Sequence, residues 1–340
     1  MKLISFAIPS YNSEAYLHHA VDTILTGGED VEIIIINDGS KDGTAAIADS
    51  YVEKYPTIVK AVHKPNGGHG SGVNRGLVEA TGLYYKVVDS DDWVDEKALR
   101  ELILTVKRHV SKGIEADLYI HNFVYEHVED NTQKCRSWTS KFPVNRFFGW
   151  DEMKPFMASE TLLMHNLMYK TEKLRESGTV LPEHTFYVDN IFAFQPLPYC
   201  EKLYYMDVNL YHYFIGRDDQ SVNEQVMLTR IDQQIRVNKI MIDVFTRQNW
   251  SGLDKNVRKY MIIYLNKIMT VTSVILLVGG TSEDYAKKCD LWSYLKSRNE
   301  KLYFRLRMTF LGVAMNLPTK LGRRTTVRGY KIVRKFIHFN

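Results

Sequence analysis

Cysteines are scarce in this chain of 340 residues, which has only Cys135, Cys200 and Cys289. They are far apart, odd in number and without metal-ligand spacing, so we expect buried small side chains in a reducing compartment. This excludes a secreted scaffold held together by disulfides. The chain also lacks a basic and apolar leader before its first strand-like run at Lys2, so we expect a cytoplasmic protein.

Long hydrophobic runs are also missing. The longest charge-free stretch near the C-terminus lies between Lys267 and Glu283 and is interrupted by hydroxyl side chains. A membrane-spanning helix needs about 20 predominantly apolar residues, so no transmembrane segment is expected. The composition is 45% hydrophobic, 12% aromatic and 25% charged, which supplies a core and excludes a disordered or fibrous protein.

Acidic residues are absent from the last forty positions. Residues 301–340 hold ten of the 44 basic side chains, so the first 300 residues carry 34 basic against 40 acidic side chains. A basic tail on an acidic body indicates an anionic partner. We do not expect nucleic acid as that partner, because no recognition motif accompanies the basic residues.

Strand-like and helix-like segments alternate over the first hundred residues. Apolar runs of strand length occupy residues 3–8, 31–36, 58–62 and 84–88, and segments with helical spacing of apolar residues lie between them. This alternation predicts a mostly parallel, doubly wound α/β sheet.

Beyond residue 110 the pattern is less regular. Residues 118–125 and 203–213 have the character of strands, residues 186–194 that of a short helix, and the rest of the chain is helical. We therefore predict an α/β domain over residues 1–221 and a helical C-terminal region over residues 222–340.

Polar residues follow each of the four predicted strands. The segments are Pro9-Ser10-Tyr11-Asn12, Asn37-Asp38-Gly39, Lys64-Pro65-Asn66-Gly67-Gly68 and Asp89-Ser90-Asp91-Asp92. In a parallel α/β sheet, ligands bind at the carboxyl ends of the strands. We therefore expect the four loops to converge on one ligand site.

Asp89, Asp91 and Asp92 crowd three carboxylates at the end of a buried strand. Such groups repel one another unless a cation joins them, and hard oxygen ligands suit Mg²⁺ or Mn²⁺ next to phosphates. The alternative is an acidic loop that caps the helix beginning at Asp95. A calcium-binding EF-hand fits less well, because the loop lacks the central glycine and the alternating ligands.

Together these segments resemble the catalytic domain of family 2 glycosyltransferases, inverting enzymes of the GT-A fold, of the bacterial cell-surface polysaccharide type. The resemblance rests on four motifs in order: Ile8-Pro9-Ser10-Tyr11-Asn12, Ile36-Asn37-Asp38-Gly39-Ser40-Lys41-Asp42-Gly43-Thr44, Asn66-Gly67-Gly68, and Asp89-Ser90-Asp91-Asp92. The last is similar to the family's DxD motif. A weaker resemblance extends to residue 221, and it implies a nucleotide-diphosphate sugar as donor.

The resemblance implies a role for each matching position. Pro9, Tyr11 and Asp38 are expected around the nucleotide base, with Tyr11 stacking on it and Asp38 accepting a base N–H. Asp89 is expected to face the ribose, and Asp91 to hold the Mn²⁺ or Mg²⁺ that bridges both phosphates. The other implied donor-binding residues are Asn12, Gly68, Asn74, Arg75, Ser90, Arg217 and Ser221.

Two of these positions need comment. Family members commonly carry Ala-Arg-Asn where this chain has Gly72-Val73-Asn74 followed by Arg75, so Arg75 is the candidate replacement for the missing guanidinium. Arg217 and Ser221 resemble a loop that closes over the donor diphosphate, and a guanidinium is suited to neutralising that leaving group.

Asp189 is the implied catalytic base, because the acceptor hydroxyl must lose its proton as it attacks the anomeric carbon. Family members carry an acidic pair here, whereas this chain has Val188 before Asp189. A helix-capping role is the alternative for Asp189. His212 is a candidate third metal ligand with Asp89 and Asp91, the alternative being a packed strand histidine.

The function expected from these roles is inverting transfer from a UDP-sugar to a hydroxyl of a glycan or lipid-linked glycan. One alternative is a sugar nucleotidyltransferase, although such enzymes usually carry a basic glycine-rich loop where this chain has Pro-Ser-Tyr-Asn. Another is a non-catalytic nucleotide-sugar-binding protein. A dinucleotide oxidoreductase is excluded, since no G-x-G-x-x-G follows the first strand.

The last forty residues mix aromatic, aliphatic and basic side chains, as in residues 302–307 and 330–337. Such mixtures are typical of interfacial amphipathic segments. We expect residues 301–340 to dock on an anionic membrane, at the inner face of the cell membrane, with each basic residue contributing ~1 kcal/mol. A solvated tail is the alternative, and the helical region is also a candidate contact for a homo-oligomer.

Overall fold

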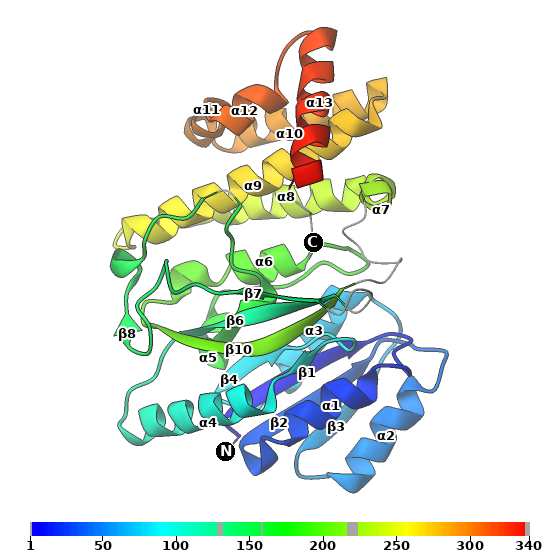
Figure 1. Ribbon diagram of the computed structural model, residues 1–340, viewed down its shortest axis with the longest axis vertical. Helices are drawn as coiled ribbons and strands as arrows, with labels where there is room; N and C mark the ends of the chain where they lie inside the picture. Colours follow the sequence, from blue (N-terminus) through cyan, green and yellow to red (C-terminus); the bar gives the residue numbers. More distant parts are fainter. Residues whose placement is uncertain (1, 128–131, 158, 216–223, 337–340) are drawn as a thin grey trace. The chain divides into compact units, whose positions relative to one another are not determined.

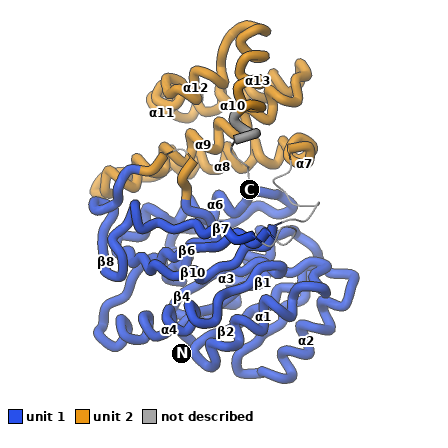
Figure 2. The backbone as a smooth tube through the Cα atoms, in the orientation of Figure 1, with its two compact units in different colours: residues 1–155, 162–216 blue, residues 156–161, 217–340 orange. Residues whose placement is uncertain are grey.

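The computed structural model describes residues 2–127, 132–157, 159–215 and 224–336 (Figure 1). The chain divides into two compact units (Figure 2). Unit 1 comprises residues 1–155 and 162–216, and unit 2 comprises residues 156–161 and 217–340. The predicted domain boundary at residue 221 lies outside the described residues.

Within the described residues, unit 1 is built on a ten-stranded sheet with the order β3-β2-β1-β4-β9-β6-β10-β5 (Figure 1). β7 adds to β6, and β8 adds to β10. The strands are β1 (Ile4–Ser10), β2 (Val31–Asn37), β3 (Val59–His63), β4 (Tyr84–Val87), β5 (Trp93–Val94), β6 (Leu118–His127), β7 (Thr132–Arg136), β8 (Phe147–Phe148), β9 (Leu167–Lys170) and β10 (Leu203–Ile215).

The helices of unit 1 follow the strands along the chain. The α-helices are α1 (Leu17–Leu25), α2 (Thr44–Lys54), α3 (His69–Glu79), α4 (Glu96–Ser111), α5 (Thr171–Glu176) and α6 (Asp189–Phe194). The 3-10 turns are η1 (Gly28–Asp30), η2 (Trp150–Glu152), η3 (Met164–Asn166) and η4 (Leu197–Tyr199). The expected cap of α4 is present, because the Asp95 side chain accepts a hydrogen bond from the Ala98 N–H at 2.8 Å.

The parallel half of the sheet explains the regular sequence pattern. Every residue of β1 and β2 is buried, as their nearly unbroken apolar runs predict for strands covered on both faces. Apolar residues of α1 and α4, among them Leu17, Val21, Leu99 and Leu102, pack with these strands in one core. The α/β class is therefore confirmed.

The second half makes the sheet mixed. β9 runs antiparallel to β4 on one side and to β6 on the other, whereas β6 and β10 are parallel. β9 is only four residues long and carries no alternating pattern of its own, so periodicity did not reveal it. This strand places η3, and with it His165, beside the parallel half.

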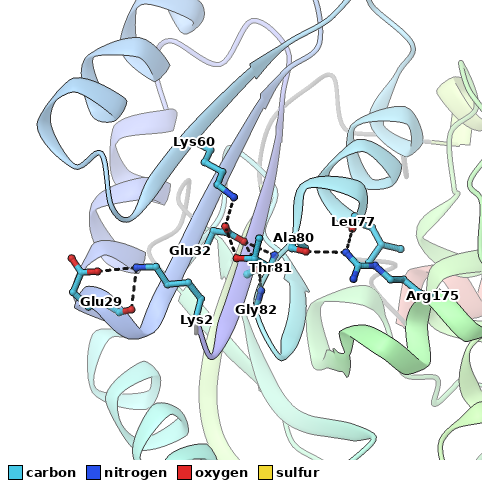
Figure 3. Close-up of polar contacts among 10 residues, drawn as sticks. Lys2, Glu29, Glu32, Lys60, Leu77, Ala80, Thr81, Gly82 and Arg175 are labelled. Carbon is cyan, nitrogen blue, oxygen red and sulfur yellow. Dashed lines mark hydrogen bonds and ion pairs between the residues drawn. The ribbon is translucent and has the colours of Figure 1, made fainter.

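The amino ends of the parallel strands carry a buried carboxylate, Glu32 (Figure 3). Its oxygens accept hydrogen bonds from the Ser5 hydroxyl at 2.6 Å and from the Thr81 N–H and hydroxyl, both at 2.9 Å. Lys60 completes the set with an ion pair of 2.6 Å. Nearby, Arg175 donates to the carbonyls of Leu77 and Ala80 and so caps the C-terminal end of α3 (Figure 3).

Residues 224–336 of unit 2 form helices joined by short connections. Its helices are α7 (Glu224–Thr229), α8 (Ile231–Arg247), α9 (Lys255–Gly279), α10 (Ser282–Arg298), α11 (Glu300–Arg307), α12 (Phe310–Met315) and α13 (Lys320–Phe336). The predicted apolar stripe is buried on α9, including Met261, Leu265 and Ile268.

Among the described helices, α9 is the one long and apolar enough to cross a membrane, with a mean hydropathy of 1.9 over an 18-residue window. However, 67% of that window is buried inside the structure, and the core helix of a soluble protein meets the same criteria. The feature is therefore weak support for a membrane span.

Candidate active site

Side-chain and backbone hydrogen bonds join the four loops at the carboxyl edge of the sheet. The Asn12 Oδ1 accepts from the Lys41 N–H at 2.9 Å, which links the loops after β1 and β2. The Asp38 carboxylate links the loops after β2 and β3, and the Ser13 and Ser90 hydroxyls, 2.7 Å apart, link those after β1 and β4. The expected convergence is therefore present.

The loop after β1 offers an aromatic surface. Tyr11 is 51% exposed, so its side chain is accessible to a ligand. Asn12 adopts a left-handed conformation with a φ of 50°, and its N–H donates to the Ser40 hydroxyl at 3.0 Å. Pro9 is buried at the position where Gly72 of α3 approaches β1 without a side chain. Asn12 and Pro9 thus shape the loop that presents Tyr11.

Asp38 holds the glycine loop in place. Its two oxygens accept from the N–H groups of Gly67 and Gly68 at 2.9 and 2.7 Å, and Lys64 pairs with it at 2.5 Å. Gly68 needs its lack of a side chain, because it has a φ of +81° and lies against the backbone of His184. A carboxylate offers about four acceptor sites, so a further bond from a base N–H stays possible.

Asn74 and Arg75 of α3 point in different directions. The Asn74 amide donates to the Leu181 carbonyl at 2.8 Å and accepts from the Leu181 N–H at 2.9 Å, so it fastens α3 to the segment that leads into α6. Arg75 instead pairs with Glu79 one turn along α3, and its side chain is 48% exposed. The structure therefore places Asn74 as a positioning residue and Arg75 on the exposed face of the helix.

His69 joins carboxylates from two distant segments. Its Nε2 donates to the Asp89 Oδ1 at 2.8 Å, and its charge also acts on Asp189 at the start of α6. Burial works to raise the pKa of Asp89, but the attraction and hydrogen bond of His69 outweigh it and lower that pKa. For Asp189 burial dominates, opposed by His69 and reinforced by Asp89, and its pKa is raised.

Asp92 lies deeper than its neighbours. Its carboxylate accepts hydrogen bonds from the Tyr211 hydroxyl and, at 2.9 Å, from the Phe214 N–H. Burial, reinforced by the charges of Asp91 and Asp89, raises the pKa of Asp92 well above its usual value. The loop after β4 therefore crowds carboxyl groups together, as the sequence indicated, and β10 binds the buried carboxyl group of Asp92.

A group able to bind a metal ion lies at this loop. Ligand atoms of Asp89, Asp92 and His165 are all within 4.8 Å of one another. His212, the expected third ligand, is not in this group: its Nδ1 is 2.6 Å from the Glu126 Oε1, and its ring stacks on Trp93 with 5.5 Å between centroids. The carboxylates fit a divalent cation, because their mutual repulsion is relieved by one.

Some expected residues were not placed, and others were not foreseen. Arg217 and Ser221 lie outside the described residues. Sequence reasoning missed His165 because it stands in an irregular segment without a motif, and it missed Tyr211 as the partner of Asp92. The contact of His69 with Asp89 was not foreseen either.

The sequence is similar to those of known proteins. Residues 5–163 match the family model described as glycosyl transferase family 2. EpsH of Bacillus subtilis (strain 168) is 28% identical over 220 residues, which cover 62% of this chain and 60% of EpsH. The chain therefore spans less than two thirds of the length of that relative.

Solved structures show the same fold over nearly the whole chain. S. aureus TarS 1–349 superposes with a TM-score of 0.69 at 16% identity, covering 98% of this chain and 92% of that one. Its complex with UDP-GlcNAc gives a TM-score of 0.66. The mannosyltransferase PcManGT from Pyrobaculum calidifontis, solved with GDP-Man and Mn²⁺, gives 0.52 at 13% identity, covering 99% and 88%. The expected GT-A fold with a helical C-terminal region is confirmed.

Proposed function

The chain carries a domain of glycosyl transferase family 2 over residues 5–163, and on this premise we propose that it is an inverting glycosyltransferase. It moves a sugar from a UDP-sugar to a hydroxyl of a glycan or lipid-linked glycan. The observation that carries the proposal is the meeting of Asp89 and Asp189, one hundred residues apart, through His69. Asp89 lies on the side of the donor, and Asp189 acts on the acceptor.

The donor's nucleotide lies on the loops after β1, β2 and β3. Tyr11 stacks on the base, and Asp38, already bound to the glycine loop, accepts a base N–H. The N-terminus of α3, which follows Gly68, suits an anion. The solved complex of TarS with UDP-GlcNAc supports a uridine nucleotide as the donor.

The diphosphate lies at the loop after β4. Asp89 and Asp91 would hold a Mn²⁺ or Mg²⁺ ion there together with the neighbouring Asp92, and Ser90 shapes the loop through its contact with Ser13. The ion, when bound, neutralises the developing charge of the leaving nucleoside diphosphate. The Mn²⁺ complex of PcManGT supports a cation in this role.

Asp189 removes the proton of the acceptor hydroxyl as that oxygen attacks the anomeric carbon. Its raised pKa makes the ionised carboxylate a stronger base than an exposed aspartate. The attack takes place in one displacement, so the β-linked product forms from an α-donor without a covalent enzyme intermediate. Asn74 supports Asp189 indirectly, because it fixes the segment before α6 to α3.

The acceptor is handled at an anionic membrane surface. Unit 2 exposes large apolar side chains in α11, α12 and α13 and at the end of α11, namely Phe304, Met308, Phe310, Leu321 and Ile332. Exposed basic residues are interspersed with them, and residues 301–340 hold no Asp or Glu. An apolar and basic surface of this kind binds the interface of a bilayer with anionic lipids.

Vesicle co-sedimentation tests this surface in the full chain. We expect binding to anionic vesicles, weaker binding to neutral vesicles, and a loss of binding when Phe304→Ser and Phe310→Ser are combined. Val78→Ser, which removes a side chain 71% exposed in α3, serves as the control. Equal recovery of all proteins with and without vesicles would contradict the membrane part of the proposal.

A nucleotide-release assay tests the reaction itself. The full chain is mixed with a series of nucleotide sugars and Mn²⁺, and free nucleoside diphosphate is followed. We expect slow, metal-dependent hydrolysis of one UDP-sugar that falls in Asp91→Ala and Asp189→Asn but not in Asp290→Asn, a change at an exposed site. Tight UDP binding without release from any donor, even with glycan acceptors, would favour the non-catalytic alternative.

A further inference from the structure

One histidine beside the acidic loop has no role in the reaction described so far. A ring nitrogen of His165 lies within 4.8 Å of a carboxylate oxygen of Asp89 and of Asp92. The aspartates follow β4, whereas His165 belongs to η3, more than seventy residues later in the chain. It also lies beyond residues 5–163, the segment that the family model matches.

His165 is held rigidly with an unsatisfied nitrogen. The residue is 8% exposed, and among the described residues its Nδ1 is buried without a hydrogen-bond partner. The ring lies against Tyr211 and Tyr213, with centroids 4.7 Å away in both cases. Lys86 fixes its backbone by donating to the His165 carbonyl at 2.8 Å.

A buried ring nitrogen without a hydrogen-bond partner is energetically unfavourable in the folded protein. A buried polar group without a partner destabilises the folded protein, because its lost hydration is not replaced by a hydrogen bond. An imidazole nitrogen with carboxylate oxygens is a common ligand set for transition metals, whereas Mg²⁺ is bound through oxygen. A cation that accepts nitrogen ligands could therefore use the ring nitrogen of His165 that lies next to Asp89 and Asp92.

We propose that His165 supplies a nitrogen ligand to the divalent cation at Asp89 and Asp92, and that the site therefore favours Mn²⁺ over Mg²⁺. The inference rests on the proposed function for the presence of a cation at this loop. His212 has no such part, because its Nδ1 is bound to Glu126. His165 thus adds a ligand from η3 to the carboxylates that follow β4.

Pulsed electron paramagnetic resonance of the Mn²⁺-loaded full chain tests the nitrogen ligand, with and without UDP. We expect a ¹⁴N coupling in the wild type that is lost in His165→Gln. His121→Gln is the matched control, because His121 is also buried, has an unpartnered Nε2 and lies outside the metal group. His69→Gln, which alters the other histidine near Asp89, should keep the coupling.

Metal titrations test the selectivity. Loss of a residue that only hydrogen-bonds to a metal ligand commonly weakens metal binding by about 10–100-fold. Because His165 is proposed as a direct ligand, losing it should weaken Mn²⁺ binding by at least about tenfold. Mg²⁺ binding should change less than Mn²⁺ binding. The ratio of Mg²⁺ to Mn²⁺ needed to displace Mn²⁺ should therefore be lower for His165→Gln than for the wild type. Equal displacement ratios in the two proteins would contradict the inference.

The wild-type spectrum keeps the test independent of whether the variant folds. Absence of ¹⁴N coupling both with and without UDP overturns the inference, as does a coupling that persists in folded His165→Gln. Metal-dependent release of UDP without a ¹⁴N coupling would overturn the inference and leave the proposed function intact. A ¹⁴N coupling that depends on His165, combined with no nucleotide release from any donor, would support the inference and contradict the proposed function.

Discussion

Glu32 at the amino edge of the parallel sheet and the pair Asp92 and Asp189 at the carboxyl edge are buried carboxylates in opposite electrostatic situations. At the amino edge, Glu32 receives three hydrogen bonds and an ion pair, and its pKa is lowered: burial raises it, but Lys60, Ser5 and Thr81 outweigh burial. At the carboxyl edge, Asp92 and Asp189 have raised pKa values because burial is not outweighed. A satisfied carboxylate stabilises the fold, whereas crowded ones retain the capacity to bind a cation or a proton.

The largest effect is expected from Asp189→Asn at the carboxyl edge. The amide keeps the shape of the side chain but cannot take the acceptor proton, so kcat should fall by about 10²–10⁴ with little change in stability. Steady-state transfer rates, with thermal unfolding as the control, check this. A variant that retains wild-type kcat would remove Asp189 from the role of base.

The pH dependence of sugar transfer tests the raised pKa of Asp189. Because the pKa of Asp189 is raised, the base is lost as the pH falls through a value above the usual 3.9 for aspartate, with activity dropping about tenfold per pH unit below it. His69 lowers the pKa of Asp189, so His69→Gln should move this acidic limb to higher pH. A limb that moves to lower pH would contradict the assigned geometry.

At the amino edge, Glu32→Gln should destabilise the protein by ~1–3 kcal/mol, because it breaks charge-assisted bonds in a buried site. Activity per folded molecule should stay unchanged. The folded-state pKa of Glu32 is lowered, so its contribution is present above the unfolded-state value and is lost as the pH falls through the folded-state value. Denaturant unfolding at pH 7 and near pH 3 should show the difference between the two proteins shrinking.

The smallest effect is expected for Asp92→Asn in metal-free protein. The change removes a carboxylate whose ionisation is opposed by Asp91 and Asp89, and an amide oxygen still accepts from Tyr211 or Phe214. Unfolding free energy should change by less than ~1 kcal/mol, well below the effect of Glu32→Gln. With Mn²⁺ present, the thermal shift that metal gives the wild type should be reduced in this variant.

Much of the carboxyl edge was predictable because it follows from local pattern. The apolar runs of β1 and β2 locate the strands, and the polar segments after them must gather at one edge of a parallel sheet. The four loops, the acidic cluster and the cap at Asp95 were therefore visible in the residues. The family resemblance added Asp189, which pattern alone would leave as a helix cap.

Other features depend on contacts between distant segments. Arg75 is adjacent to Asn74 in the chain, yet one step along a helix turns a side chain by about 100°, so Asn74 contacts Leu181 while Arg75 pairs with Glu79 on the exposed face. β9 is too short to produce a periodic signal, although it carries η3 into the sheet. Local patterns cannot encode either arrangement.

The sequence by itself determined the α/β class, the four loops of the site and the separation of an acidic body from a basic tail. Each is set by residues close together in the chain, through strand periodicity, turn chemistry and charge. Only the tertiary structure decided that His69 joins Asp89 and lies near Asp189, that Tyr211 holds Asp92, and that His165 rather than His212 stands beside the carboxylates. Those contacts form between segments far apart in sequence, where packing selects the partners.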